Sequence, residues 1–352
     1  MPTAMVKSSA LAAAFLLVAN SPHAATPEPP AAAAHVDKAR ALAGSEFAHS
    51  LFLCDPQGTM TIASVALEGA DHWLPPTWAF DDLGYVGNQF VGVWVLRTSA
   101  GLILFDSGES TADVQSHILP GLRELGLDPA AIRFVVVTHG HWDHYGGAKF
   151  LQETYGSRIA MSAEDWDLID RLPPGSIERA PMFGADRADR PPPRRDMVIH
   201  DGSTLTLGGK TVRLYVTPGH TPGTLSALIP VTEGGKPHLL SLLGGTAFPR
   251  TLEATSTTGG LRAFSASVER LSKLSQGAGA DGIINTHIFV DGSAERLAAA
   301  HARKAGEATP FVLGRQAVTR YYAMFDECLK AAAERPFEPV DFSKLTPGSE
   351  AQ

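Results

Sequence analysis

Short apolar runs separated by turn residues dominate the first half of the chain. Three of these runs follow one another closely and are joined by Gly, Asn or Ser, which is typical of a β-meander. Beyond them, apolar residues at helical spacing alternate with short β-branched runs, and this order favours helices alternating with buried strands. The predicted elements are strands at 83–86, 92–97, 101–106, 134–137 and 159–161, and helices at 111–125, at 148–154 and after Ser162.

The second half of the chain repeats the same kinds of element. The last helix carries most of its apolar residues on one face, so it needs an apolar surface to pack on. The predicted strands are 197–199, 203–207, 211–216, 226–229, 239–243 and 282–286, and the predicted helices are 261–274, 293–304 and 314–334.

Residues 172–196 interrupt the pattern between the two halves. This stretch is rich in proline and arginine and lacks apolar periodicity, so it is expected to be a long loop. Long loops within compact domains commonly serve function, and we interpret this one as a flap near a functional site. A solvated surface loop is the alternative.

The amino terminus has the pattern of a secretory signal peptide. Lys7 precedes an apolar core at 10–18, and small residues follow at Ala24 and Ala25. That core is shorter than the roughly 20 residues needed to span a bilayer. We therefore expect residues 1–25 to be removed on export, which leaves a periplasmic or secreted protein with no membrane attachment.

Residues 26–50 are expected to form a linker and an N-terminal segment. Prolines and the alanines at 31–34 favour a linker at first, and a short helix is predicted from His35 to about Ala48. The linker is thus expected to separate the signal peptide from the folded domain.

Composition and charge narrow the class of protein. The chain has 352 residues, 44% of them hydrophobic, so it can bury a large core. Its net charge of -8 and the lack of a long basic run argue against binding to a nucleic-acid backbone.

The two cysteines, Cys54 and Cys328, either form a disulfide, as export permits, or are buried free thiols. Both lie in apolar segments outside the predicted sheets, and packing these segments together would bring the thiols close.

Histidines recur where predicted strands end. The stretch from Thr138 to His144 directly follows the strand at 134–137, and two further histidines follow the strands at 211–216 and 282–286. Strand ends at one sheet edge are where layered α/β folds place their chemistry. Imidazole and carboxylate are ligands that zinc prefers, and six such donors suffice for two metals with open positions for water. The candidate donors are His139, His141, Asp143, His144, His220 and His287.

These landmarks resemble the metallo-β-lactamase fold superfamily. The H-x-H-x-D-H motif at 139–144 matches in full, and Asp106-Ser107-Gly108, the Pro-Gly-His turn at His220 and His287 follow in the family's order. The resemblance implies an α/β fold, a four-layer αββα sandwich with the site at the edge shared by the two sheets. Residues 51–305 would form the catalytic domain, and residues 306–352 a C-terminal helical extension.

The resemblance also implies a ligand set and a reaction. Two zinc ions per chain would be bound, one by His139, His141 and His220, and the other by Asp143, His144 and His287. Asp106 would contact one of the metal ligands without binding a metal itself. A hydroxide between the metals would attack the substrate, and Asp143 would act as a catalytic residue by handling a proton.

One departure points to a subclass. Many hydrolases of this superfamily bridge their metals with the aspartate of a Gly-Asp-Thr turn, but Gly244-Gly245-Thr246 stands here, so no carboxylate is available. This pattern resembles the third subclass of metallo-β-lactamases, which are also exported. Thr246 would contact the substrate where those enzymes carry a serine, and Phe248 occupies a place where a polar residue would help to bind a substrate carboxylate.

The expected function follows from this resemblance. It is the opening of a cyclic amide in a small-molecule substrate by an exported zinc hydrolase, and a β-lactam is the expected substrate. A lactonase or another ester hydrolase is the alternative because it needs the same attacking group. A third hypothesis is an exported zinc-binding protein without catalytic turnover.

Overall fold

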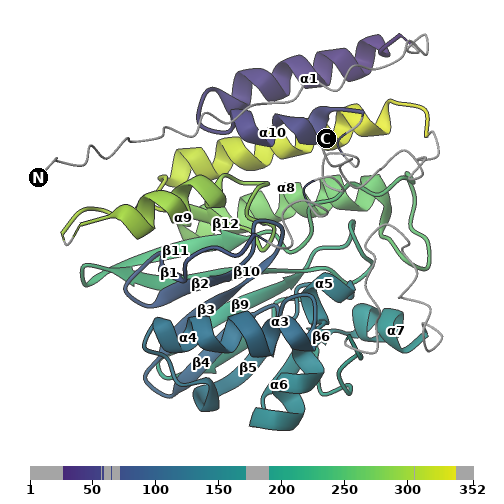
Figure 1. Cartoon of the computed structure of the whole chain (residues 1–352). Helices are drawn as coiled ribbons and strands as arrows, with labels where there is room; N and C mark the ends of the chain where they lie inside the picture. Colours follow the sequence, from purple (N-terminus) through teal and green to yellow (C-terminus); the bar gives the residue numbers. More distant parts are fainter. Residues whose placement is uncertain are drawn as a thin grey trace, which may run out of the picture.

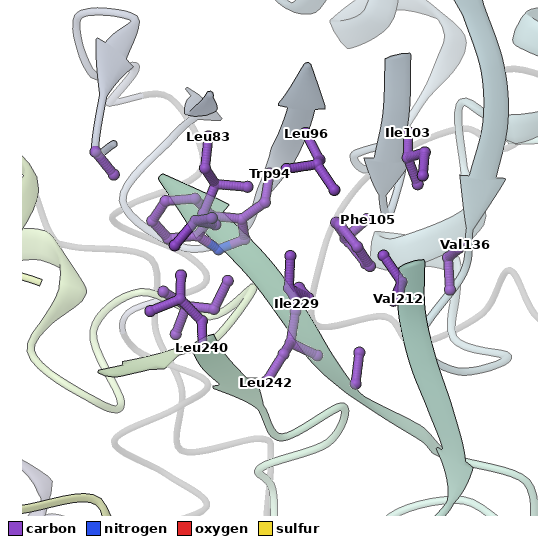
Figure 2. Packing of buried hydrophobic residues seen from close by; sticks show 14 of the residues in the cluster. Leu83, Trp94, Leu96, Ile103, Phe105, Val136, Val212, Ile229, Leu240 and Leu242 are labelled. Carbon is purple, nitrogen blue, oxygen red and sulfur yellow. The ribbon is translucent and has the colours of Figure 1, made fainter. Parts of the chain in front are cut away.

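Two β-sheets packed face to face form the centre of the molecule (Figure 1). The computed structural model describes residues 27–56, 58, 65, 72–171, 190–304 and 306–337. Side chains from the facing sides of the sheets fill the space between them, among them Trp94 and Phe105 from one sheet and Ile229 and Leu242 from the other (Figure 2). This central cluster fixes how the two sheets face each other.

Within the described residues, the first sheet has seven strands in sequential order. The three strands of the predicted meander, β2 to β4, pair antiparallel, as does β1, which the sequence did not indicate, and the last four strands pair parallel. The strands are β1 (Thr77–Trp78), β2 (Leu83–Gly87), β3 (Gly92–Thr98), β4 (Gly101–Phe105), β5 (Ile132–Val136), β6 (Arg158–Ser162) and β7 (Met197–Ile199).

The second sheet, over the part of the chain that the structure describes, has five strands in the order β12-β11-β10-β9-β8. All of its pairs are antiparallel except β11 with β12. The strands are β8 (Thr204–Leu207), β9 (Lys210–Val216), β10 (Leu225–Glu233), β11 (Lys236–Leu242) and β12 (Gly282–Ile284).

Helices cover the outer face of each sheet, so the expected four-layer αββα sandwich is confirmed (Figure 1). The predicted helix at 111–125 is one helical run with a π-helical turn in its middle. The first sheet is covered by α3 (Thr111–Asp113), η2 (Val114–Ile118), α4 (Leu119–Glu124), α6 (Ala148–Tyr155) and α7 (Ala163–Arg171), and the second by α8 (Gly260–Ala278) and α10 (Arg315–Ala333). The remaining helices are α1 (Pro30–Ala43), η1 (Ala48–Cys54), η3 (Pro129–Ala131), α5 (Trp142–Tyr145) and α9 (Ser293–Ala302).

The amino-terminal helix differs from the prediction. It begins at Pro30 instead of His35 and ends at Ala43, so the alanines at 31–34 are helical and not a linker. Proline is tolerated in the first turn because its missing N–H has no helical partner there, and alanine is the strongest helix former. Buried alanines of α1 face α10, which gives the helix a surface to pack on. Tertiary packing therefore outweighed the linker-like composition.

The carboxy-terminal helix α10 matches its prediction. Tyr321, Phe325 and Cys328 are buried on the face that the sequence indicated. Cys328 forms a disulfide with Cys54, with Cα atoms 4.4 Å apart, and this confirms the pairing of the two cysteines. Helix α10 thus lies between α8 and α1, and both α1 and the segment η1 pack on α10 (Figure 1).

Three predicted features fall partly or wholly outside the described residues. These are the signal peptide at 1–25, most of the proline- and arginine-rich loop, and the end of the C-terminal extension. Within the ranges given above, none of the helices combines the length and the apolar character needed to cross a bilayer.

Candidate metal centre

The loops that follow three strands, β5, β9 and β12, bring the six predicted ligands together at one edge of the sandwich. His139 and His141 follow β5, and the short helix α5 then carries Asp143 and His144. His220 lies in the turn between β9 and β10, and His287 comes three residues after β12 ends. The six side chains form two groups of three, and within each group the potential ligand atoms all lie within 4.8 Å of one another.

The first group is His139, His141 and His220. The Nε2 atom of His220 lies 3.1 Å from Nε2 of His139 and 3.0 Å from Nδ1 of His141. Ligands of a tetrahedral zinc ion, each about 2.0–2.1 Å from the metal, are separated by about 3.3–3.4 Å. The spacing of these nitrogens therefore fits a common cation, which would also relieve the repulsion between their lone pairs.

The second group is Asp143, His144 and His287. The Nε2 atoms of His144 and His287 are 3.1 Å apart. An oxygen of Asp143 lies 3.3 Å from Nε2 of His144 and 3.5 Å from Nε2 of His287. These distances also suit one cation, and here the ligand set carries a carboxylate.

Backbone carbonyls fix the ring orientation of three histidines. The Nδ1 atom of His139 donates to Gly244 O at 2.9 Å, that of His220 to Ala247 O at 2.7 Å, and that of His287 to Phe90 O at 3.0 Å. A carbonyl oxygen only accepts, so Nδ1 carries the hydrogen in each ring and Nε2 keeps its lone pair for a metal. These carbonyls therefore select the ligating tautomer.

Asp106 does the same for His144. Its carboxylate accepts from Nδ1 of His144 at 2.6 Å, and from the backbone N–H and the hydroxyl of Thr138 at 2.7 and 3.0 Å. The residue has a φ of 64°, a left-handed conformation that is uncommon outside glycine. The fully buried Asp106 thus lies behind the second group, where the sequence resemblance put it.

Electrostatics differ between the two groups. Burial and the neighbouring imidazoles lower the pKa of His139 and His220 well below the usual value, and burial lowers the pKa of His141. Burial also opposes a charge on His144, yet the carboxylates of Asp143 and Asp106 raise its pKa to about 10. Without a metal, these effects favour neutral imidazoles in the first group and a protonated His144 in the second.

The other two members of the second group follow the same pattern. Burial favours the neutral acid in Asp143, but His144 and His287 hold the pKa of this carboxyl well below its usual value. Burial and the charge of His144 lower the pKa of His287 to about 4. Asp143 is thus ionised, and His287 is neutral.

Sequence reasoning did not identify Asp165 as part of the site. This fully buried carboxylate accepts from the backbone N–H of Gly140, from the hydroxyl of Thr221 and from the backbone N–H of Gly223, at 2.8, 2.7 and 2.8 Å. It therefore joins the loop of His139 and His141 to the loop of His220. Burial raises its pKa to about 6, against the effect of these hydrogen bonds. In the sequence it looked like an acid in the first turn of a helix.

A second buried group beside the site was also missed. Glu109 accepts from the Nδ2 atom of Asn88 at 3.1 Å and lies 3.9 Å from a guanidinium nitrogen of Arg190. The guanidinium carbon of Arg190 lies 4.0 Å from the ring centroid of Trp142, inside the H-x-H-x-D-H motif. Burial raises the pKa of Glu109 to about 7, and the charge of Asp143 adds to this increase.

The turn after β11 lies against His220. A Cβ atom at Gly245 would be 2.6 Å from the Cβ atom of His220, so an aspartate does not fit there without displacing this ligand. Thr246 is buried and lies in the sequence between Gly244 and Ala247, the residues whose carbonyls orient His139 and His220. Phe248 instead packs on Phe264 and Phe325, with ring centroids 6.0 and 5.3 Å apart, and so belongs to the helical layer.

Comparisons with known proteins agree with this geometry. Residues 86–232 match the family model of the metallo-beta-lactamase superfamily. An uncharacterized protein of Mycobacterium leprae is 30% identical over 47% of this chain and 72% of its own length. A hydroxyacylglutathione hydrolase of Acidiphilium cryptum is 30% identical over 38% of this chain and 43% of its own.

Two solved structures are similar across most of the chain. BJP-1, a subclass B3 metallo-beta-lactamase of Bradyrhizobium japonicum, has a TM-score of 0.62 and 25% identity, covering 74% of this chain and 93% of that one. The FEZ-1 metallo-beta-lactamase of Legionella gormanii has a TM-score of 0.58 and 21% identity, covering 72% and 92%. Both contain the sandwich described above.

Proposed function

The chain belongs to the metallo-beta-lactamase superfamily of metallo-hydrolases, and we propose that it is an exported enzyme that uses two zinc ions to open a β-lactam. The observation that carries this proposal is the donor set at the sheet edge. Two groups of three ligands are complete, and Gly245 leaves no room for a carboxylate between them. The resemblance to BJP-1 supports the same subclass.

The residues of the chain have distinct roles in this proposal. Zinc supplies Lewis acidity, which lowers the pKa of water and stabilises negative charge on the attacked carbonyl oxygen. Hydrogen bonds at Nδ1 orient four of the imidazoles, so that Nε2 is the ligating atom in each; His144 must also lose a proton when a cation binds.

Asp143 and Thr246 are the proposed catalytic residues. Ring opening of an amide requires a proton on the leaving nitrogen. A carboxylate has two oxygens, so Asp143 can bind a cation with one oxygen and transfer a proton with the other. Thr246 follows Gly245, whose backbone lies against His220 in the turn after β11, and its hydroxyl is proposed to contact the substrate.

Export is supported by the disulfide. Cys54 and Cys328 join two segments that are far apart in the chain, and such bonds persist in oxidising compartments. Cleavage of residues 1–25 and a periplasmic or secreted location complete the proposal. Mass spectrometry of the secreted or periplasmic protein should find a mature amino terminus near residue 26, and an intact Met1 in that fraction would contradict export.

Ester hydrolysis is the second candidate function. The relative from Acidiphilium cryptum is named a hydroxyacylglutathione hydrolase, and ester, lactone and thioester cleavage need the same attacking group. The complete ligand set argues against a zinc-binding protein without turnover.

Rates on three substrate classes test the proposal. The zinc-loaded protein should hydrolyse nitrocefin with a kcat/KM at least about a hundredfold above that for an acyl homoserine lactone or a glutathione thioester. A pocket whose polar groups are hydrogen-bonded by one substrate strongly rejects other substrates that leave those groups unpaired. His220→Ala, which removes a ligand, is the control for residual background. A lactone or thioester rate above that for nitrocefin would replace the β-lactam by that substrate.

A further inference from the structure

Aromatic rings lie in a row that starts at the metal ligand His287. The ring of Phe90 is 4.7 Å from this imidazole and that of Phe289 is 5.8 Å from it, between centroids. Phe289 lies 6.3 Å from Phe90 and, on its other side, 5.9 Å from Phe52. The row therefore extends from the second ligand group towards the N-terminal segment.

The three phenylalanines come from distant parts of the chain. Phe90 lies between β2 and β3, Phe289 follows β12, and Phe52 belongs to η1. Phe90 is buried, and its carbonyl accepts the Nδ1 hydrogen of His287. Phe289 and Phe52 are only half-buried, so part of each residue is accessible to solvent, and Phe289 lies directly beside the ligand His287.

Two linkages hold Phe52 in this position. The hydroxyl of Ser50 donates to the carbonyl of Val290, the residue after Phe289, at 2.6 Å. On the other side, Cys54 is joined to Cys328 in α10. Because η1 is fixed at both ends, the aromatic ring of Phe52 has little freedom to leave Phe289.

We propose that Phe52, Phe289 and Phe90 form an aromatic wall that binds an apolar, preferably aromatic, substituent of the substrate beside the second ligand group. Phe52 and Phe289 are specificity-determining residues, and the Cys54–Cys328 disulfide positions Phe52. Uncovered aromatic rings recognise other rings by burying apolar area and by edge or offset contacts. The inference deepens the proposed function by adding an aryl side chain to the class of substrates.

A pair of zinc-binding probes tests the wall independently of the reaction. Phenylacetohydroxamate and acetohydroxamate carry the same metal-binding group and differ in one phenyl ring. Isothermal titration calorimetry with the zinc-loaded protein should give about tenfold tighter binding of the phenyl compound, as expected for partial burial of a ring. In Phe52→Ala this preference should fall to about threefold or less, with the Kd for acetohydroxamate unchanged.

Matched variants separate recognition from folding. Leu51→Ala removes a half-buried side chain from the same η1 segment and should keep the tenfold preference. The double variant Cys54→Ser, Cys328→Ser should lose the preference as Phe52→Ala does, provided that its thermal midpoint stays above the assay temperature. Phe289→Ala reports on the same wall without touching η1 and should give a similar loss.

The outcomes also distinguish this inference from the proposed function. An unchanged preference in both Phe52→Ala and Phe289→Ala, or no phenyl preference or binding in the parent protein, would overturn the wall. A lost preference in a protein that does not hydrolyse nitrocefin would keep the wall and reject the β-lactam assignment. With β-lactams, Phe52→Ala should raise KM for benzylpenicillin severalfold more than for 6-aminopenicillanic acid, with little change in kcat.

Discussion

The two ligand groups of the centre differ in the charge of their side chains. His139, His141 and His220 are neutral imidazoles, two of them oriented by backbone carbonyls. The second group contains the ionised Asp143 and a histidine backed by the carboxylate of Asp106. The ligands of the first group therefore do not neutralise the charge of a bound cation. In the second group, the carboxylates of Asp143 and Asp106 partly neutralise it.

This difference has consequences for how each group fills. The first group has no proton to lose near neutral pH, because burial and mutual repulsion keep its imidazoles deprotonated. At the second group a cation replaces the proton that Asp143 and Asp106 hold on His144. We expect the two groups to be separable by substitutions that touch one of them alone.

Loss of a ligand should have the largest effect. His220→Ala and His287→Ala each leave two ligands in one group, and two ligands bind a catalytic metal poorly. Each variant should retain one zinc per chain and lose at least about a hundredfold in kcat/KM, more than substitution of an outer residue costs. Elemental analysis after desalting measures the metal, and two retained zinc ions in either variant would refute that ligand.

Asp106→Asn should weaken the second group selectively. The amide no longer supplies the charged acceptor for Nδ1 of His144, and loss of such support typically costs about 10–100-fold in metal affinity. The first group should keep its affinity because its acceptors are carbonyls of other residues. Zinc titration against a fluorescent chelator resolves the two affinities, and equal weakening of both would show that the groups are not independent.

Asp165→Asn should have the reverse selectivity and a smaller effect. The amide has one accepting oxygen for three donors, so at least one donor on Gly140, Thr221 or Gly223 loses its partner, at about 1–3 kcal/mol. Both affected loops carry first-group ligands, and we expect about a tenfold loss of zinc affinity there. The same chelator titration applies, and a loss confined to the second group would contradict the assignment.

Glu109→Gln tests whether the buried carboxyl group of Glu109 makes the stability of the protein depend on pH. Burial raises the pKa of Glu109 from 4.5 to about 7, so the folded state binds the extra proton between these values. Stability therefore falls as pH rises through this window, and the neutral glutamine avoids the loss. In zinc-free protein the variant should be more stable than the parent by about 1–3 kcal/mol at pH 8, and about equal to it at pH 4.5.

Urea unfolding in the presence of a chelator measures this difference. Glu253→Gln, at an exposed position in a surface ion pair with Arg262, is the control and should change stability by less than about 0.5 kcal/mol at either pH. A parent protein whose stability does not fall between pH 4.5 and 8 relative to Glu109→Gln would mean that Glu109 is not buried as a charged group.

Local patterns allowed the sequence to predict the sheets and the six side chains that the structure brings together in two potential metal-binding groups. Each ligand follows an apolar run, and strand ends gather at a sheet edge whatever the loops between them do. The face of α10 that carries Tyr321 and Cys328 was equally visible because helical spacing reports burial directly.

The missed features depend on contacts between distant segments. Asp165 joins loops around residues 140 and 222, and nothing near it in sequence marks that role. The start of α1 at Pro30 depends on its packing against α10. The approach of Phe52 to Phe289 depends on the disulfide and on Ser50. Tertiary contacts of this kind leave no periodic signal in the chain.

The central claim is that two electrostatically different groups each bind one zinc ion. Calorimetric titration of zinc into the chelator-treated protein, repeated at pH 7 in buffers of different ionisation enthalpy, tests it most directly. We predict that two zinc ions bind per chain. The zinc ion that His287→Ala fails to bind should release close to one proton, and the zinc ion that His220→Ala fails to bind should release little. A single equivalent, or equal proton release at both groups, would contradict the account.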